Sequence, residues 1–217
     1  MNDPSNPAAC LLCLVRHGET DWNNERRLQG QLDIGLNATG LLQARAVQRA
    51  LAGMAFAAAY SSTLARAWAT AEIACARLGL AVSPAPTLRE RHYGVYQGLT
   101  TAEAAERHPQ VHRRHERRDP DFDYHGGETL LDFAARVMEG LDELANRHRG
   151  QTILGFTHGG VLDIVYRAAI GSGLEGPRDF PIPNAGLNWL EHADGAWRIV
   201  RWADARHFAQ SLDEFAV

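Results

Sequence analysis

The sequence predicts an α/β fold, a three-layer sandwich in which a mainly parallel central sheet with an antiparallel edge carries helices on both faces. The apolar runs at 11–15 and 151–157 have the length and composition of buried strands. Stretches with helical spacing separate the strands, which favours parallel pairing. Two further runs, at 187–191 and 197–202, flank Asp194-Gly195, a dipeptide typical of a tight hairpin turn and hence of antiparallel strands.

Caps and chain breakers place the remaining elements. The polar stretch at 22–37 is predicted to be an active-site loop. Thr39 is the predicted N-cap of the helix that follows it, and Ser61-Ser62-Thr63 is predicted to cap the next one. Helices are predicted at 39–51, 64–78, 100–108 (ended by Pro109), 129–148 and 161–170, and further strands at 55–60 and 81–83.

The length of 217 residues fits one large domain. Residues 1–9, with two prolines and two asparagines, are predicted to be a flexible tail. Residues 10–217 are predicted to form a single domain with a polar excursion at about 109–128. Because this excursion is rich in Arg, His and Asp and poor in core residues, we expect it to be solvated and to lie near the mouth of the site.

Composition narrows the class of function. A net charge of −4 argues against nucleic-acid binding, and no stretch has the roughly 20 apolar residues of a membrane span. The chain contains no lysine, which excludes lysine Schiff-base chemistry and a P-loop. Cys10 and Cys13 would point to opposite faces of a strand, so they predict packing rather than a metal or redox site. We expect a cytoplasmic protein, and the exposed sheet edge leaves room for a homodimer.

Two strands share one pattern, an apolar run followed by histidine and glycine. His17 follows the first of them and His158 the second, so both side chains would meet if the two strands are neighbours. Arg16 precedes His17, and Arg66 lies in the first turn of a helix, where free N–H groups favour an anion. Arg16, Arg66 and the helix start are therefore predicted to surround one phosphoryl group.

We call these groups around the phosphoryl group the cage. To transfer the phosphoryl group, the site also needs a nucleophile and a proton donor. An attacking imidazole must be neutral, and nearby guanidinium groups disfavour its protonated form. His17, beside Arg16, is therefore the predicted nucleophile. Glu90, after a strand and before Tyr93-Gly94, is the predicted general acid for the leaving oxygen.

Four sequence blocks, in this order, resemble the histidine phosphatase superfamily, also called phosphoglycerate mutase-like. They are RHGETDWN, SSTLARAWATA, LRERHYGVYQGLT and GFTHGG, and GGET (126–129) and PNAGLN (183–188) resemble phosphatase-type members. The resemblance implies that His17 is phosphorylated, that Arg16, Arg66 and His158 hold the phosphoryl group with help from Asn23, and that Glu90 donates the proton. It implies no metal and no required cofactor.

The resemblance implies a histidine acid-type phosphatase or a phosphoglycerate mutase-like phosphotransferase. We favour a metal-independent phosphomonoester hydrolase acting on a small phosphorylated metabolite. The alternative is a mutase that depends on 2,3-bisphosphoglycerate as primer. In such mutases an arginine pair on a longer insertion binds the substrate, and Arg113-Arg114 are the predicted counterparts, but the lysine expected after Gly98-Leu99 is absent.

Two other readings come from the same residues. A non-catalytic module that binds a phosphorylated ligand would also need the cage, although such proteins usually lose the nucleophile or the acid. His108, His112 and His115 have helical spacing that could bind a metal, but no carboxylate or cysteine completes the set.

Overall fold

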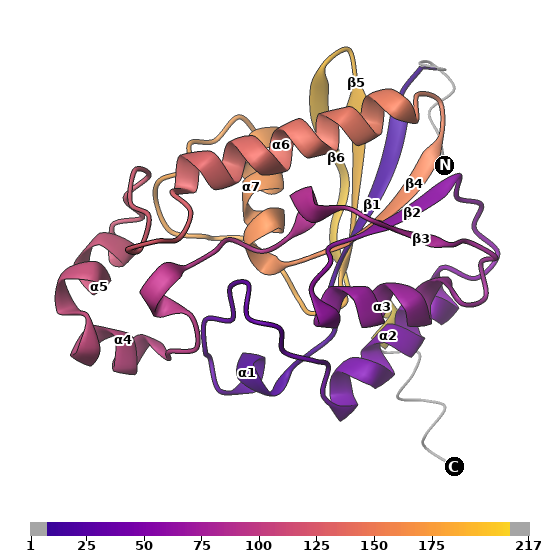
Figure 1. The fold of residues 1–217 in the computed structure, drawn as a ribbon. Coiled ribbons are helices and arrows are strands. Elements are labelled where there is room, and N and C mark those ends of the chain that lie inside the picture. Colours follow the sequence, from indigo (N-terminus) through magenta and orange to yellow (C-terminus); the bar gives the residue numbers. More distant parts are fainter. Residues whose placement is uncertain (1–7, 209–217) are drawn as a thin grey trace.

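The computed structural model describes residues 8–208, and a six-stranded mixed sheet lies at its centre (Figure 1). The strand order is β3-β2-β4-β1-β5-β6. The strands are β1 (Cys10–Arg16), β2 (Ala58–Ser61), β3 (Val82–Pro84), β4 (Thr152–Thr157), β5 (Leu187–Ala193) and β6 (Ala196–Asp204). The first four pair in parallel, and β5 and β6 form the antiparallel edge. The predicted fold class is confirmed.

Helices cover both faces of the sheet, with α6 and α7 on one side and α2 and α3 on the other (Figure 1). The α-helices are α1 (Asp21–Asn24), α2 (Ala38–Ala50), α3 (Ala65–Cys75), α4 (Thr101–Arg107), α5 (Pro109–Glu116), α6 (Leu130–Arg147) and α7 (Gly159–Ala169). Two 3₁₀ turns are η1 (Pro86–Leu88) and η2 (Gly94–Tyr96).

Strand β1 contributes to both cores because its side chains alternate between the two faces. Cys10, Leu12 and Leu14 pack in the cluster beneath α6 and α7. Cys13 and Val15 pack in the cluster beneath α2 and α3. The prediction that Cys10 and Cys13 face opposite sides and serve packing is confirmed, and burial raises the pKa of the Cys10 thiol to about 11.

Three local predictions are corrected. Asn37, not Thr39, caps α2, because its side chain accepts a hydrogen bond from the backbone N–H of Gly40 at 2.8 Å. The predicted serine cap of the next helix is absent, since α3 follows Leu64 without a side-chain cap. The loop predicted at 22–37 begins with the short helix α1, whose Thr20 and Asn23 form a capping box.

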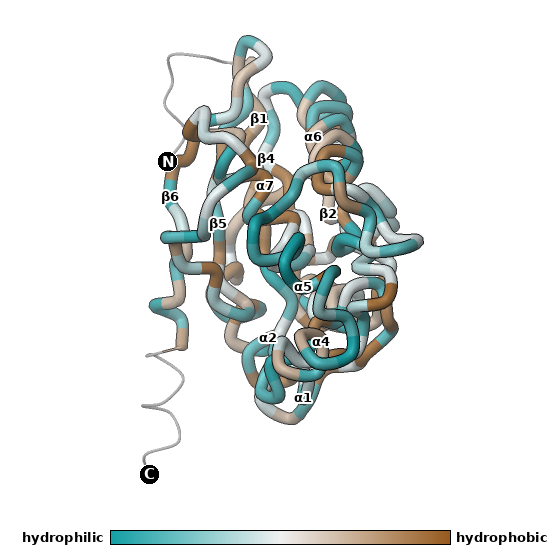
Figure 2. The backbone as a smooth tube through the Cα atoms, turned by 90° about the vertical axis from the view of Figure 1, so that its left-hand side faces the viewer, coloured by the Kyte–Doolittle hydropathy of each residue, from teal (hydrophilic) through white to brown (hydrophobic). Residues whose placement is uncertain are grey.

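The predicted polar excursion at 109–128 is more ordered than its composition indicates. Although the backbone of α5 is largely hydrophilic in Figure 2, Val111, Phe122 and Tyr124 are buried in a small cluster with Tyr96 and Ala104. We call α4, α5 and residues 117–127 the cap. Aromatic stacking, a guanidinium contact of Arg91 on the Tyr124 ring at 4.8 Å and hydrogen bonds between histidines and tyrosines replace aliphatic packing there.

These hydrogen bonds also involve two of the three histidines whose helical spacing could bind a metal. The His115 ring lies 2.7 Å from the Tyr124 hydroxyl, and the His112 ring lies 3.1 Å from the Tyr96 hydroxyl. Among residues 8–208 no group of three His, Cys, Asp or Glu side chains could hold a metal ion.

The hairpin is as predicted, with Asp194 and Gly195 both at positive φ between β5 and β6. The predicted flexible tail at 1–9 lies, except for its last two residues, outside the described residues. No helix in the described part of the chain is long and apolar enough to cross a membrane.

Capping of α2 gives a stability prediction. We expect Asn37→Ala to lower the free energy of unfolding by about 1 kcal/mol, because one N–H of the first turn loses its acceptor. Thr39→Ala, at an exposed position inside the helix, should change it by less than about 0.5 kcal/mol. Urea denaturation of both variants measures the difference, and equal costs would contradict the assignment of the cap.

Candidate active site

The site lies at the carboxyl ends of β1 and β4, which are neighbours in the sheet. Their parallel register pairs Arg16 with Thr157, so His17 and His158 are the next residues on the two strands. The ring centroids of the two histidines are 5.2 Å apart. The prediction that strand pairing brings together two histidines 141 positions apart in the sequence is confirmed.

The His17 side chain is buried and has one ring nitrogen fixed. Its Nδ1 lies 2.6 Å from the carbonyl oxygen of Gly18, which can only accept, so Nδ1 carries the proton. The lone pair is therefore on Nε2. Burial and the guanidinium groups of Arg66 and Arg16 hold the pKa of His17 well below its usual value near 6.5. The ring is neutral at physiological pH and has the electronic state that a nucleophile requires.

His158 is also buried, and its ring has a hydrogen-bond partner that the sequence analysis did not predict. Its Nε2 lies 2.7 Å from Oγ of Ser62, a residue that we had expected only to cap a helix. Its Nδ1 is buried without a hydrogen-bond partner among the described residues. Burial, followed by Arg66, holds the pKa of His158 well below its usual value. A neutral ring with one unpaired nitrogen can bind a phosphoryl oxygen without adding charge.

The buried Arg66 and the half-buried Arg16 flank the histidines. Arg16 donates through Nη1 to the carbonyl of Ile182 at 2.5 Å. Arg66, 1% exposed, donates to the carbonyls of Gly30 at 2.7 Å and Leu32 at 2.9 Å. Burial lowers the pKa of each guanidinium to about 10, so both stay charged at neutral pH. The Nε of each has no partner among the described residues, which leaves donors available for an anion.

Glu90 is held by two backbone N–H groups. Oε1 accepts from Arg91 at 2.8 Å, and Oε2 accepts from Gly160 in the first turn of α7 at 2.9 Å. A Cβ at position 160 would lie 2.1 Å from Oε1 of Glu90, so only glycine permits this approach. The second glycine after His158 therefore makes room for the carboxylate.

These groups share one cavity of about 350 Å³. Of the predicted site residues, the cavity is lined by Arg16, His17, Asn23, Arg66 and Glu90. The buried His158, whose ring is in contact with that of His17, is not among the lining residues. The Asn23 Oδ1 accepts from the backbone N–H of Thr20 at 3.1 Å, which leaves its Nδ2 as the amide group that can donate into the cavity.

The substrate-binding roles predicted for Arg113 and Arg114 receive no support from the cavity. Neither residue lines it, and Arg114 instead forms an ion pair with Asp119 at 2.7 Å. Both roles stay predictions. Four other arginines do line the cavity: Arg26, Arg27, Arg118 and Arg178. Arg118 belongs to the arginine-rich excursion predicted at 109–128, and no sequence motif marks the other three.

The lining has an excess of positive charge. Six arginines face two carboxylates, Glu90 and Asp163. Arg27 pairs with Glu25 and Glu103, and Arg118 donates to Asp163 at 2.5 Å. The exposed Arg26 and Arg178 have no carboxylate partner within residues 8–208. The cavity is therefore suited to an anion that carries more than one negative charge.

The fold is an α/β sandwich, and its site brings two histidines and two arginines together at the carboxyl edge of the sheet. A family model described as the histidine phosphatase superfamily (branch 1) matches residues 12–205. The chain belongs to this superfamily and is an enzyme of its phosphatase and phosphoglycerate mutase-like class, as the sequence blocks predicted.

Curated relatives carry names of both kinds. An Arabidopsis thaliana metal-independent phosphoserine phosphatase is 37% identical over 201 residues, 91% of this chain and 83% of the relative. Phosphoglycerate mutase-like protein 4 of the same plant is 37% identical over 204 residues, which cover 92% and 87%.

Solved structures agree on the fold. YhfR of Bacillus stearothermophilus is 31% identical with a TM-score of 0.84, covering 91% of this chain and 98% of that one. A mycobacterial glucosyl-3-phosphoglycerate phosphatase in complex with VO3 is 32% identical with a TM-score of 0.80, covering 90% and 99%.

The lowered pKa of His17 predicts how stability depends on pH. Once unfolded, the imidazole binds a proton as pH falls below about 6.5, whereas folded it does not, so the unfolded state binds more protons and stability falls. Between pH 7.5 and 5.5 we expect His17→Asn to remove about 1 kcal/mol of the wild-type loss. Chemical denaturation at the two pH values measures this, and equal losses would show that His17 titrates alike in both states.

Proposed function

We propose that the chain is a metal-independent phosphomonoester hydrolase that works through a phosphohistidine on His17. The observation that carries the proposal is a neutral His17 ring with a free Nε2, set among two guanidinium groups in the same cavity as Glu90. The arrangement supplies a nucleophile, charge for the transferred group and a proton donor.

In the first step, Nε2 of His17 attacks the phosphorus of the substrate. An N–P bond forms as the P–O bond to the leaving group breaks, and Glu90 gives its proton to the leaving oxygen. Arg16 and Arg66 stabilise the charge on the phosphoryl oxygens, while His158 and Asn23 donate hydrogen bonds to them. Each such buried donor contributes about 10²–10³ in rate in comparable sites.

In the second step, water attacks the phosphohistidine. Glu90, now a carboxylate, accepts a proton from the water as the N–P bond breaks. The products are inorganic phosphate and the starting form of His17. No step needs a metal or a cofactor, in keeping with the name of the metal-independent plant relative. A mycobacterial relative with this fold was solved in complex with VO3, which supports a site for a phosphate-like anion in proteins of this kind.

The proposed substrate is a small phosphorylated metabolite. A cavity of about 350 Å³ has room for a compact leaving group beyond the phosphoryl cage. Arg26 and Arg178 line the cavity without a carboxylate partner in the described part of the chain, and they favour a leaving group that carries its own negative charge.

One assay distinguishes the hydrolase from the mutase alternative, which is kept because several relatives carry phosphoglycerate mutase names. A mutase would interconvert the two phosphoglycerate positions only when primed by 2,3-bisphosphoglycerate. We expect release of inorganic phosphate without primer and no interconversion. Primer-dependent interconversion that exceeds phosphate release would replace the hydrolase assignment.

The covalent intermediate can be trapped. With ³²P-labelled substrate and an alkaline quench, which preserves phosphohistidine, we expect label on the peptide containing His17. His17→Ala should carry no label and show no turnover, while its circular dichroism spectrum stays that of the wild type. Turnover of the wild type without label on His17 would exclude the proposed mechanism.

Loss of one phosphate ligand should slow the reaction without abolishing it. We expect Arg66→Ala to lower kcat/KM at least tenfold, because one buried charged donor is lost. Arg113→Ala, which alters an exposed residue outside the cavity lining, should change it less than about twofold. A comparable loss in both variants would point to an effect on folding, which thermal melts would reveal.

Metal removal and an anion analogue test the chemistry together. Activity should persist in excess EDTA, and vanadate should inhibit competitively because it adopts the five-coordinate geometry of the phosphoryl transfer. Loss of activity in EDTA that returns on adding a divalent cation would contradict a metal-independent reaction.

A further inference from the structure

The segment that carries Glu90 has no regular secondary structure. Residues 89–93 lie between η1 and η2 and belong to no strand of the sheet. An irregular segment inside a protein must find partners for its backbone groups elsewhere. What supplies those partners also determines where the Glu90 carboxylate points.

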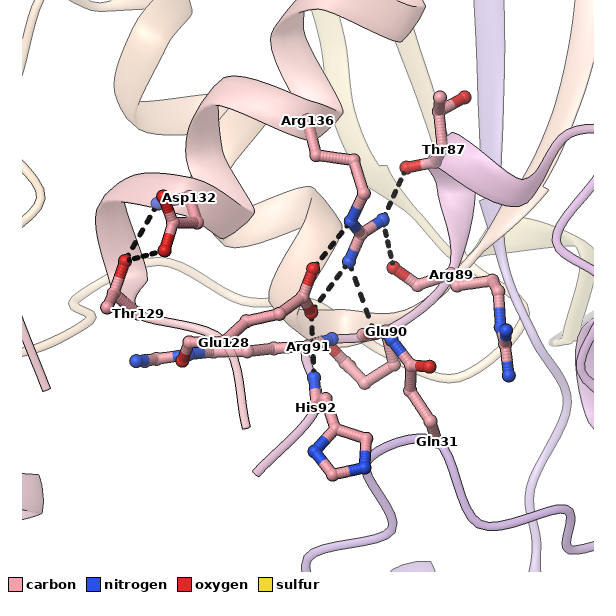
Figure 3. Close-up of polar contacts among 10 residues, drawn as sticks. All are labelled: Gln31, Thr87, Arg89, Glu90, Arg91, His92, Glu128, Thr129, Asp132 and Arg136. Atoms are coloured by element: carbon pink, nitrogen blue, oxygen red, sulfur yellow. Dashed lines mark hydrogen bonds and ion pairs between the residues drawn. The ribbon is translucent and has the colours of Figure 1, made fainter. Parts of the chain in front are cut away.

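Gln31 donates through Nε2 to the Glu90 carbonyl at 2.9 Å, and Arg136 of α6 supplies partners for that carbonyl and for the Arg89 carbonyl. Nη1 of Arg136 donates to the carbonyls of Thr87 at 2.8 Å and Arg89 at 3.1 Å, and its Nη2 reaches the carbonyl of Glu90 at 3.4 Å. Nε and Nη2 donate to the two carboxylate oxygens of Glu128 at 2.7 and 2.9 Å. All five N–H groups of the guanidinium are used, three of them on the segment that leads into Glu90 (Figure 3).

Glu128 holds the far side of the same segment. Its Oε2 accepts from the backbone N–H of His92 at 2.8 Å, and its own N–H donates to the His92 carbonyl at 2.9 Å. The carbonyl of Glu128 accepts from Nε of Arg91 at 3.0 Å. Residues on both sides of Glu90 are therefore bound to Glu128 or to its partner Arg136.

A glycine permits this close packing. A Cβ at position 127 would lie 2.3 Å from the carbonyl oxygen of His92 and 2.7 Å from the nitrogen of Gly94. Gly127 and Glu128 belong to the GGET motif, which the reaction proposed above does not otherwise use. The motif therefore acts on the acid-bearing segment rather than on the substrate.

We propose that Glu128 and Arg136 form a clamp that positions Glu90 for proton transfer to the leaving group. Both side chains lie outside the lining of the cavity and act only through the backbone of residues 87–92. They are positioning residues, and the proposal rests on the general-acid role proposed for Glu90. Figure 3 shows the two side chains meeting directly beside the Glu90 backbone.

Position matters for an acid more than for a phosphate ligand. Proton donation requires the carboxyl group within hydrogen-bond reach of the leaving oxygen, about 2.6–3.2 Å. A shift of the segment by a few tenths of an ångström would weaken this contact, while His17, Arg16 and Arg66, which lie on other elements, would stay in place.

The test separates proton donation from binding by changing the leaving group. An alkyl phosphate such as glycerol phosphate needs its leaving oxygen protonated, whereas p-nitrophenyl phosphate releases a stable phenolate. We would measure kcat/KM for both, since this constant reports the steps up to the first phosphoryl transfer. Glu128→Gln and Arg136→Lys should lower it about tenfold for glycerol phosphate and less than about threefold for p-nitrophenyl phosphate.

An Arg–Glu ion pair on the sheet, with a carboxylate of similar exposure, provides the control. Glu191 on β5 has a side chain that is 20% exposed and pairs with Arg198, whereas that of Glu128 is 22% exposed. Glu191→Gln and Arg198→Lys should leave both substrates unaffected. Glu90→Gln serves as the reference and should show the same leaving-group selectivity with a larger loss.

The outcomes distinguish the clamp from the proposed function. If Glu90→Gln slows both substrates equally, the general-acid role fails and the clamp loses its basis. Suppose instead that Glu90→Gln slows glycerol phosphate selectively. If both clamp variants then slow the two substrates equally, or slow neither substrate, the clamp is overturned. Should Glu128→Gln fail to fold, as judged by its thermal melt, Arg136→Lys, which keeps the charge but cannot bridge the three carbonyls, decides the question.

Discussion

Two guanidinium groups, on Arg16 and Arg66, are held almost out of water beside two imidazoles. Burying a charge is costly, and here main-chain carbonyls of Gly30, Leu32 and Ile182 compensate only in part. Both arginines line the cavity and each has an Nε without a partner among the described residues, so a dianion there would compensate their charge. Burial, and after it these charges, keep both imidazoles neutral, so the groups that favour an anion also favour the nucleophilic form of His17.

The sheet makes this arrangement possible. Because β1 and β4 pair in parallel and in register, their carboxyl ends bring His17 and His158 to one point. The other groups arrive from loops and helix starts that pack against this point. Arg66 comes from the first turn of α3, and Glu90 is bound by the first turn of α7. The rigid part of the fold thus holds the histidines, and side-chain contacts hold the acid.

How much of the site could be predicted from the sequence depends on whether a residue's position is set by a local pattern or by tertiary packing. The pattern of an apolar run followed by His-Gly correctly predicted where His17 and His158 lie. Such a run, ended by charged or polar residues, is a local signal for the carboxyl end of a buried parallel strand. Ser62 was missed as a partner of His158, since a serine before a helix has a more common use as a cap. Nothing in the sequence distinguishes Arg178 at the cavity from Arg114 on the cap, because both are arginines in polar stretches whose positions depend on tertiary packing.

Helix α7 joins several of these parts in one rigid body. His158 is the residue from which it starts, the N–H of Gly160 holds the Glu90 carboxylate, and Asp163 one turn on receives Arg118 of the cap. A displacement of the cap that pulled on Arg118 would therefore be passed along the helix axis to His158 and Glu90 together.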